Sequence, residues 1–227
     1  MPLSVLSAMR EAGRHKITVK GGKFLERLSQ ADTVIFDKTG TLTRACPTVS
    51  QIIAFNGRDE RELLHGAGIG KTVMLTGDSR NTAAAVAQKL RIDDYHAEVL
   101  PEDKAQYIRD EQAQGRTVVM IGDGINDAPA LSLADVGIAI GSGATIAREV
   151  ADITIAAEDL RELVLLRRLS ERLMRRIGRN YRFVMSFNGA LILFGALGLL
   201  PPATSALLHN GSTLLLSMDC LSDLLPE

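Results

Sequence analysis

The sequence predicts an α/β domain with a parallel sheet, followed by a C-terminal hairpin of transmembrane helices. Between about Gly22 and Ala157, short β-branched runs alternate with helical stretches, which is typical of a parallel sheet with helices on its faces. No Asp, Glu, Lys or Arg occurs between Phe183 and Met218, and each crossing of a bilayer needs about 20 apolar helical residues. An arginine-rich stretch directly precedes this uncharged segment.

The composition indicates a folded chain in a reducing compartment. The 227 residues are 46% hydrophobic and 23% charged, which is enough apolar mass for a core and excludes a large multidomain machine. A formal net charge of -1 gives no general attraction for nucleic acid. Cys46 and Cys220 lie too far apart in the sequence for a disulfide framework or a metal-ligand pair.

The α/β segment predicts its elements in a regular order. We expect strands at Thr33 to Phe36, Val49 to Ala54, Thr72 to Leu75, Thr117 to Ile121 and Val136 to Ala139. We expect helices at about 59–65, 80–91, 102–114 and 127–134. Ligands bind beyond the carboxyl ends of parallel strands, so the residues that follow each strand are the candidates for a site.

Residues 159–182 predict an amphipathic linker helix that continues into the first membrane span. Its apolar residues recur at helical spacing, and its arginines indicate a cytoplasmic flank: Arg161, Arg167, Arg168, Arg172, Arg175, Arg176, Arg179 and Arg182. Residues 183–218 predict two membrane helices, separated by a break at Pro201-Pro202. Residues 219–227 are expected to form a tail. A buried helical hairpin of a soluble fold stays open, because the run contains polar residues: Asn188, His209 and Asn210.

Acidic residues follow three of the predicted strands. Asp37 follows the first, Thr76-Gly77-Asp78 follows the third, and a stretch with Asp123 and Asp127 follows the fourth. Carboxylates brought together at one edge repel one another unless a cation neutralises them. An all-oxygen site suits Mg²⁺, which usually serves a phosphate. Nearby glycines let backbone N–H groups approach an anion, and Lys104 supplies a positive charge.

These residues resemble the signatures of one family. Asp37-Lys38-Thr39-Gly40-Thr41-Leu42-Thr43 resembles the phosphorylation motif of P-type ATPases, which have the haloacid dehalogenase superfold. Thr76-Gly77-Asp78 and the stretch from Gly122 to Ala130 resemble the next two signatures in the right order, with Lys104 between them. The resemblance therefore implies a Rossmann-like haloacid dehalogenase fold over residues 22–158 and covers nearly the whole chain.

Two further segments are similar to the heavy-metal-translocating branch of these ATPases. They are Lys20-Gly21-Gly22 and His209-Asn210-Gly211-Ser212-Thr213. The branch implies a heavy-metal cation as cargo, a cell (inner or plasma) membrane location and a cytoplasmic phosphorylation domain. His209 and Asn210 are either cargo contacts or a polar helix-packing pair. The cargo metal itself cannot be read from the sequence.

The resemblance implies a phosphoryl transfer to Asp37, with Mg²⁺ as cofactor and ATP, or another phosphoryl donor, as the source. It implies four catalytic residues: Asp37, Lys104, Thr76 and Asp127. It implies a phosphate and nucleotide cradle: Lys38, Thr39, Gly40, Thr41, Gly77, Asp78 and Asn126. The implied Mg²⁺ ligands are Asp37, Thr39 and Asp123. Phosphatases of the superfold have an Asp where this chain has Thr39, so we expect the phosphoenzyme to persist.

The chain differs from the family because it lacks most of the nucleotide-binding insertion and a cargo ligand pair. Only a short segment, with a truncated nucleotide-binding insertion near 56–70, separates the phosphorylation motif from the Thr-Gly-Asp strand. Residues 1–21 are interpreted as the remnant of a membrane-proximal segment without a cargo ligand pair. Gly70-Lys71-Thr72 mimics the end of a P-loop, but His65 stands where its first glycine is required.

These features predict the phosphorylation core of a heavy-metal pump that does not transport by itself, because two spans cannot enclose a polar pathway. Two alternatives stay open. One is a non-catalytic membrane partner of a full-length pump. The other is a membrane-anchored phosphatase of the haloacid dehalogenase type.

Overall fold

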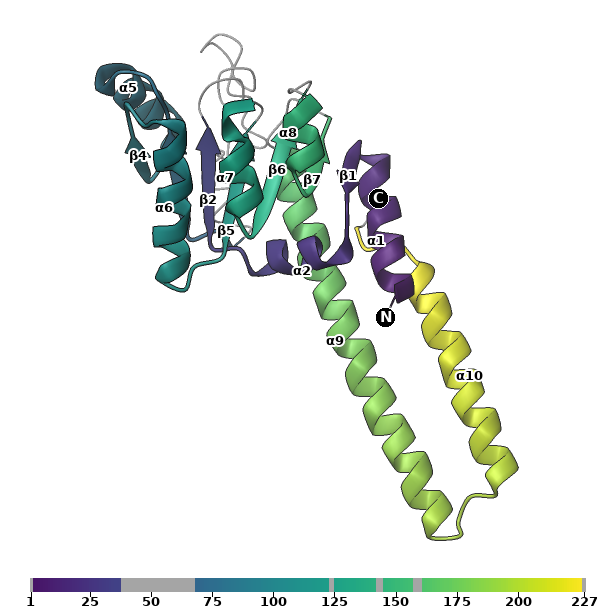
Figure 1. The fold of residues 1–227 in the computed structure, drawn as a ribbon. Helices are drawn as coiled ribbons and strands as arrows, with labels where there is room; N and C mark the ends of the chain where they lie inside the picture. The colour runs from purple at the N-terminus through teal and green to yellow at the C-terminus, as the bar shows by residue number, and fades with distance from the viewer. Residues whose placement is uncertain (1, 38–67, 123–124, 142–144, 157–160, 226–227) are drawn as a thin grey trace.

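The computed structural model describes residues 2–37, 68–122, 125–141, 145–156 and 161–225 (Figure 1). In these ranges one seven-stranded sheet has the order β1-β7-β6-β5-β2-β3-β4. Neighbouring strands run parallel, except that β1 is antiparallel to β7. The strands are β1 (Ile17–Val19), β2 (Thr33–Asp37), β3 (Lys71–Leu75), β4 (Asp94–His96), β5 (Val118–Gly122), β6 (Val136–Ile140) and β7 (Ile153–Ile155). The predicted α/β fold with a mostly parallel sheet is confirmed.

Helices cover both faces of the sheet, and alternate strand residues enter two different cores. Val34 and Phe36 pack with residues of one helix set, whereas Ile35 packs with those of the other. The first set is α1 (Pro2–Arg14), α2 (Gly22–Gln30), α5 (Arg80–Leu90) and α9 (Arg161–Ala196). The second is α6 (Pro101–Ala113), α7 (Ala128–Leu133) and α8 (Thr145–Val150). Because both faces are covered, consecutive residues of the central strands are apolar, as in Val34, Ile35 and Phe36 of β2.

The predicted strands are observed at β2, β3, β5 and β6, within a residue of the expected limits. The predicted helices at 80–91, 102–114 and 127–134 correspond to α5, α6 and α7. Strands β1, β4 and β7 were not predicted, because they have three residues each, too few for a recognisable alternation. Since β1 joins the sheet, the sheet begins before the boundary expected at residue 22. The predicted elements at 49–54 and 59–65 lie outside the described residues.

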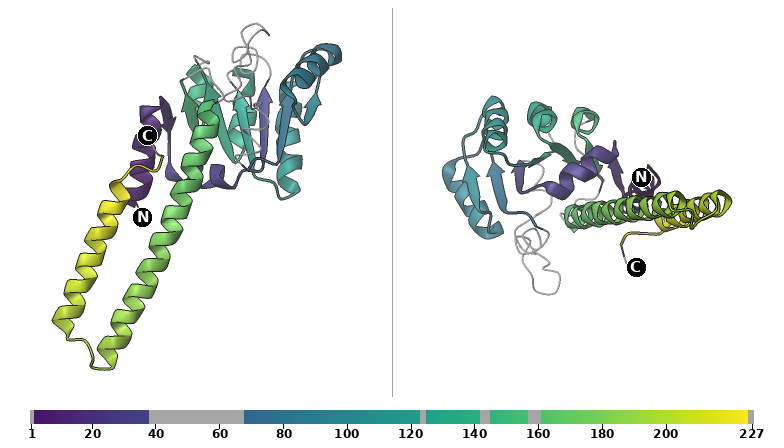
Figure 2. Two further views of the ribbon diagram at one scale, coloured as in Figure 1. Left: turned by 180° about the vertical axis from the view of Figure 1, so that it is seen from behind. Right: turned by 90° about the horizontal axis from the view of Figure 1, so that it is seen from below.

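Two long helices extend away from the sheet side by side (Figures 1 and 2). Helix α9 has 36 residues and a length of about 54 Å at 1.5 Å per residue. It runs without interruption from the arginine-rich segment into the uncharged one, as predicted. Helix α10 (Pro202–Leu221) begins with a proline at its first turn, where the missing N–H costs nothing. The predicted break at Pro201-Pro202 is the turn of this hairpin.

The hairpin presents many large apolar side chains to solvent. Examples are Ile192 at 73%, Leu207 at 73% and Leu215 at 69% exposure. Among the described residues, however, no helix combines the length and the apolar character that a bilayer crossing requires. The structure thus has two helices, α9 and α10, where the hairpin was predicted, whereas a transmembrane hairpin stays a prediction.

The chain after α10 returns to α1 and is fixed there. The buried carboxylate of Glu11 accepts hydrogen bonds from the backbone N–H groups of Leu224, at 2.8 Å, and Leu225, at 2.7 Å. Arg172 on α9 donates to the carbonyl of Leu224 at 2.8 Å. These contacts link α1, α9 and the end of α10, so the base of the hairpin is attached to the sheet domain.

Candidate active site at the carboxyl edge of the sheet

Asp37 is the last residue of the central strand β2, which is labelled in Figure 1. Strands β5 and β3 flank β2, and Asp37 pairs in register with Leu75. The aspartate is only 4% exposed. A buried carboxylate in this apolar setting is strongly destabilising unless an opposite charge is nearby.

Lys104 supplies that charge from the first turn of α6. Its Nζ lies 2.6 Å from Oδ1 of Asp37 and 2.7 Å from Oδ1 of Asp127. Burial by itself would lower the pKa of Lys104, but the charge of Asp37 and hydrogen bonds to both carboxylates outweigh it, so the pKa is raised above 10.5. The ammonium group therefore stays charged at neutral pH and holds the two acids together.

Asp127 enters the site from the short 3₁₀ turn η2 (Ile125–Asp127), which follows β5. It is 2% exposed. A Cβ added at Gly122 would lie 2.9 Å from both Cβ and Oδ2 of Asp127, so only glycine leaves room for this carboxylate. The glycines of this loop were predicted to let backbone N–H groups approach an anion. Gly122 has a second role, which the sequence did not indicate: its missing side chain leaves space for Asp127.

Thr76 lies at the same edge, directly after β3, and is fully buried. Its hydroxyl oxygen accepts a hydrogen bond from the backbone N–H of Asp78 at 3.1 Å. Its backbone N–H donates to the carbonyl of His96 at 3.0 Å. Both bonds fix the Thr76-Gly77-Asp78 loop, and the hydroxyl hydrogen can still donate to an anion because the Asp78 bond uses an oxygen lone pair.

The structure thus brings together four of the expected site residues: Asp37, Thr76, Lys104 and Asp127. Gly77 and Asp78 are in the loop beside them, and Asn126 is exposed one residue before Asp127. The other expected residues lie outside the described part of the chain: Lys38, Thr39, Gly40, Thr41 and Asp123. Among the residues that are described, no group of three or more His, Cys, Asp or Glu side chains is placed to hold a metal ion.

The arrangement is chemically suited to accept a phosphoryl group. A carboxylate held by an ammonium group is a nucleophile of fixed orientation, and the same ammonium can neutralise the oxygens of an incoming phosphoryl group. Asp37 and Asp127 offer only hard oxygen donors, which suit Mg²⁺.

His209 was considered as a cargo contact together with Asn210. In the structure the Nδ1 atom of His209 lies 3.0 Å from Oδ1 of Asn188, so the two residues form a hydrogen bond between α10 and α9. This pairing favours the helix-packing alternative. The pairing of His209 with Asn188 could not be predicted from the sequence, because it depends on how the hairpin turn aligns the two helices.

Comparison with known proteins gives the same family as the motifs. Residues 60–135 match the model of the haloacid dehalogenase-like hydrolases. A zinc-exporting P-type ATPase of Mycobacterium marinum is 39% identical over 91% of this chain and 28% of its own length. A manganese-exporting P-type ATPase of Mycobacterium leprae is 46% identical over 66% of this chain and 21% of its own.

The fold is also shared with a solved structure. A crystal structure of a zinc-transporting PIB-type ATPase superimposes with a TM-score of 0.82, at 24% identity, over 97% of this chain and 54% of that one. The chain therefore contains a haloacid dehalogenase-like domain, its homologues are metal-exporting P-type ATPases, and the expected resemblance is confirmed. The chain spans 28% and 21% of the lengths of these two curated relatives.

Proposed function

We propose that this homologue of the metal-exporting P-type ATPases is a phosphorylation core that forms an aspartyl phosphate at Asp37. The observation that carries the proposal is the buried triplet of Asp37, Lys104 and Asp127, with distances of 2.6 and 2.7 Å to the lysine nitrogen. Burying three charges at one point of a fold lowers its stability, so a function for them is expected. They also lie at the carboxyl edge of a parallel sheet, which is where ligands bind.

In the proposed reaction an oxygen of Asp37 attacks the γ-phosphorus of ATP or the phosphorus of acetyl phosphate. The bond between this phosphorus and the leaving oxygen breaks, and ADP or acetate departs with the bonding electrons. Lys104 neutralises charge on the phosphoryl oxygens, and Thr76 donates its hydroxyl hydrogen to one of them. Asp127 keeps Lys104 in place through its 2.7 Å contact. Gly77, Asp78 and Asn126 complete the cradle, together with Lys38, Thr39, Gly40 and Thr41.

The expected cofactor fits the donor chemistry of this edge. Asp37 would hold Mg²⁺ together with Asp123 and the backbone carbonyl of Thr39, all through oxygen. When bound, the ion neutralises charge on the phosphoryl group. Thr39 stands where phosphatases of the superfold have a general acid and base, so water is not activated at this position and the acyl phosphate persists.

The hairpin is the proposed membrane part. We assign α9 beyond Arg182 and α10 to the bilayer, and the sheet domain to the cytoplasm, because the arginine-rich flank precedes the exposed apolar surface. A heavy-metal cation is the proposed cargo of the assembled pump. Two helices cannot enclose a path for it, so we expect no transport by this chain alone.

The test is phosphorylation of the whole chain in nonionic detergent with Mg²⁺ and labelled acetyl phosphate or ATP. We expect an acid-stable, hydroxylamine-labile adduct that is lost in Asp37→Asn. Acetyl phosphate should label better than ATP, because the sequence has only a truncated nucleotide-binding insertion. Asp110→Asn removes an exposed acid from α6 and should label as the wild type. Equal labelling of Asp37→Asn would refute the proposal.

One observation favours a second candidate function, a non-catalytic membrane partner of a full-length pump. The apolar surface of the hairpin is open to other helices, with Leu214 at 64% and Met218 at 63% exposure. Co-purification with a full-length pump that is unchanged by Asp37→Asn, together with absent labelling, would favour this function. Repeated turnover of p-nitrophenyl phosphate would instead favour the phosphatase alternative.

A further inference from the structure

Three arginines form a line along the outer side of α9. Arg168, Arg175 and Arg182 are spaced by seven residues, which is close to two turns of an α-helix. Successive members therefore differ in direction around the helix axis by only about 20°. All three are exposed. Within the described part of the chain, none of them forms an ion pair with an acidic side chain. We call these residues the arginine line.

The neighbouring arginines of the same helix are already engaged. Arg172 donates to the carbonyl of Leu224 at 2.8 Å, and Arg176 donates to the carbonyl of Ser222 at 2.7 Å. Arg179 pairs with Asp219 of α10 at 2.7 Å. From Arg168 onward, the arginines of α9 therefore divide into a row that contacts the end of α10 and the exposed arginine line. Within the arginine line, Arg182 also donates a hydrogen bond to the carbonyl of Gly178 on its own helix, at 3.3 Å.

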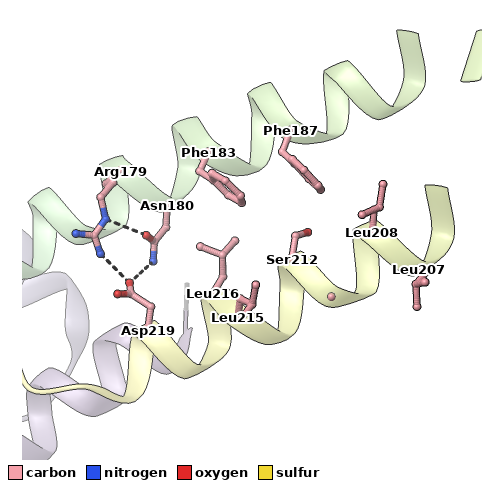
Figure 3. A pocket seen from close by; sticks show the side chains of 11 residues that line it. Arg179, Asn180, Phe183, Phe187, Leu207, Leu208, Ser212, Leu215, Leu216 and Asp219 are labelled. Carbon is pink, nitrogen blue, oxygen red and sulfur yellow. Dashed lines mark hydrogen bonds and ion pairs between the residues drawn. The ribbon is translucent and has the colours of Figure 1, made fainter. Parts of the chain in front are cut away.

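A sharp boundary between charged and uncharged surface lies at one end of the arginine line. On α9 the uncharged run of exposed apolar residues begins with Phe183, directly after Arg182. On α10 the corresponding run ends with Met218, directly before Asp219. Figure 3 shows Arg179, Asn180 and Asp219 joined at this level, with apolar side chains along both helices beyond it. The boundary between charged and uncharged residues therefore lies at a similar level of the hairpin on both helices.

We propose that Arg175 and Arg182 bind the phosphate groups of anionic phospholipids at the surface of the bilayer. The proposal rests on the membrane part of the proposed function. The apolar surface sets the depth of the hairpin, and that depth puts Arg182 at the headgroups. Guanidinium groups donate several hydrogen bonds to phosphate oxygens, and basic residues beside a membrane segment are attracted to anionic lipids.

The spacing predicts a graded contribution along the arginine line. At 1.5 Å per residue, Arg175 lies about 10 Å and Arg168 about 21 Å above Arg182 along the helix axis. The Debye length at physiological salt is about 8 Å, and a long arginine side chain can extend toward the headgroups. Arg182 should therefore contribute most, Arg175 less, and Arg168 nothing measurable. Arg168 provides a matched control on the same helix face.

The test measures binding of the whole chain to vesicles of phosphatidylcholine, with and without phosphatidylglycerol. The readout is the ratio of the two partition coefficients, so the contribution of the apolar hairpin cancels. We expect the wild type to prefer the anionic vesicles. Arg182→Gln should lower the ratio about fivefold, Arg175→Gln should lower it less, and Arg168→Gln should leave it unchanged. Raised salt should reduce the wild-type ratio.

Four other results would each contradict the proposal. An unchanged ratio in the double variant Arg175→Gln with Arg182→Gln refutes it, as does an equal loss in Arg168→Gln, which would indicate net charge alone. Competition by inorganic phosphate beyond that of chloride at equal ionic strength would indicate a site for the free ion. Failure to bind either vesicle would refute the membrane part of the function as well. Labelling of Asp37 in detergent is independent of all these outcomes.

Discussion

The active-site edge and the base of the hairpin contain ion pairs of nearly equal length in very different surroundings. Lys104 lies 2.6 Å from Asp37, with side chains 8% and 5% exposed. Arg179 lies 2.7 Å from Asp219, with side chains 61% and 39% exposed. Water screens the second pair and scarcely reaches the first. Distance therefore says little about the importance of an ion pair, and burial decides how much stability is lost when one partner is removed.

The largest effect is expected from Lys104→Met. This change removes the ammonium group that contacts the buried carboxylates of Asp37 and Asp127, and breaking such a buried ion pair costs about 3–5 kcal/mol. We expect a large fall in Tm and no acyl phosphate at Asp37. Arg109→Met, at an exposed position of the same helix, should keep both the Tm and the labelling near wild type. Unimpaired labelling of Lys104→Met would contradict the proposed role of the lysine.

Gly122→Ala tests whether the site depends on the space beside Asp127. The new Cβ would lie 2.9 Å from the aspartate side chain, so Asp127 must move and its contact with Lys104 must weaken. We expect the free energy of unfolding, measured by thermal unfolding, to fall by about 1–3 kcal/mol. We also expect labelling of Asp37 to be at least tenfold slower, which corresponds to about 1.4 kcal/mol of activation free energy.

Gly13→Ala is the control for that change, because nothing lies within 4 Å of its added Cβ. In helix α1 the alanine should preserve labelling and raise the Tm slightly. The role given to Gly122 would be wrong if both variants labelled at the wild-type rate.

Glu111 should control part of the acid sensitivity of the fold. It is 4% exposed and accepts hydrogen bonds from Lys71, at 3.1 Å, and from Arg116. Burial alone would raise the pKa of Glu111, but these two partners lower it below 4.5. Because the folded pKa is lower than the unfolded one, the stabilisation is present above pH 4.5 and is lost as the pH falls through the folded value.

Glu111→Gln should therefore lower the free energy of unfolding at pH 7 by about 1–3 kcal/mol. Its Tm should also fall less steeply than that of the wild type below the ordinary carboxyl pKa. Thermal unfolding measured over a series of pH values checks both points. Parallel pH profiles for the variant and the wild type would show that Glu111 does not contribute to the acid sensitivity.

The smallest effect is expected from Arg179→Gln at the base of the hairpin. An exposed ion pair contributes about 0.2–1 kcal/mol, so the Tm should change little and labelling of Asp37 should not change. If this variant destabilised the chain as much as Lys104→Met does, the comparison between the two ion pairs would fail.

Much of the active-site edge could be predicted from the sequence. Asp37, Thr76 and Asp127 follow apolar strand runs, and the carboxyl ends of parallel strands meet at one edge. The hairpin could be predicted as well, because charge is absent from residues 183–218 and the turn contains adjacent prolines. Its crossing of a membrane was predicted from the same pattern, but the described helices do not provide the apolar length.

Other contacts could not be predicted. Glu11 accepts bonds from residues more than 200 positions away, and no local pattern indicates such a partner. The same holds for the pairing of His209 with Asn188. The three-residue strands could not be predicted either, because they are too short to show an alternation of apolar and polar residues.

By itself, the sequence determined the order of the central strands β2, β3, β5 and β6, the helices α5, α6 and α7 between them, and the residue types at the carboxyl edge, because strand periodicity and strand ends are local properties of the chain. Only the tertiary structure decided which charges are buried. Asp37 and Asp219 are both acids paired with a basic side chain, yet the side chain of Asp37 is buried and that of Asp219 is 39% exposed. Burial depends on packing between distant segments, and that packing determines how strongly each charge acts.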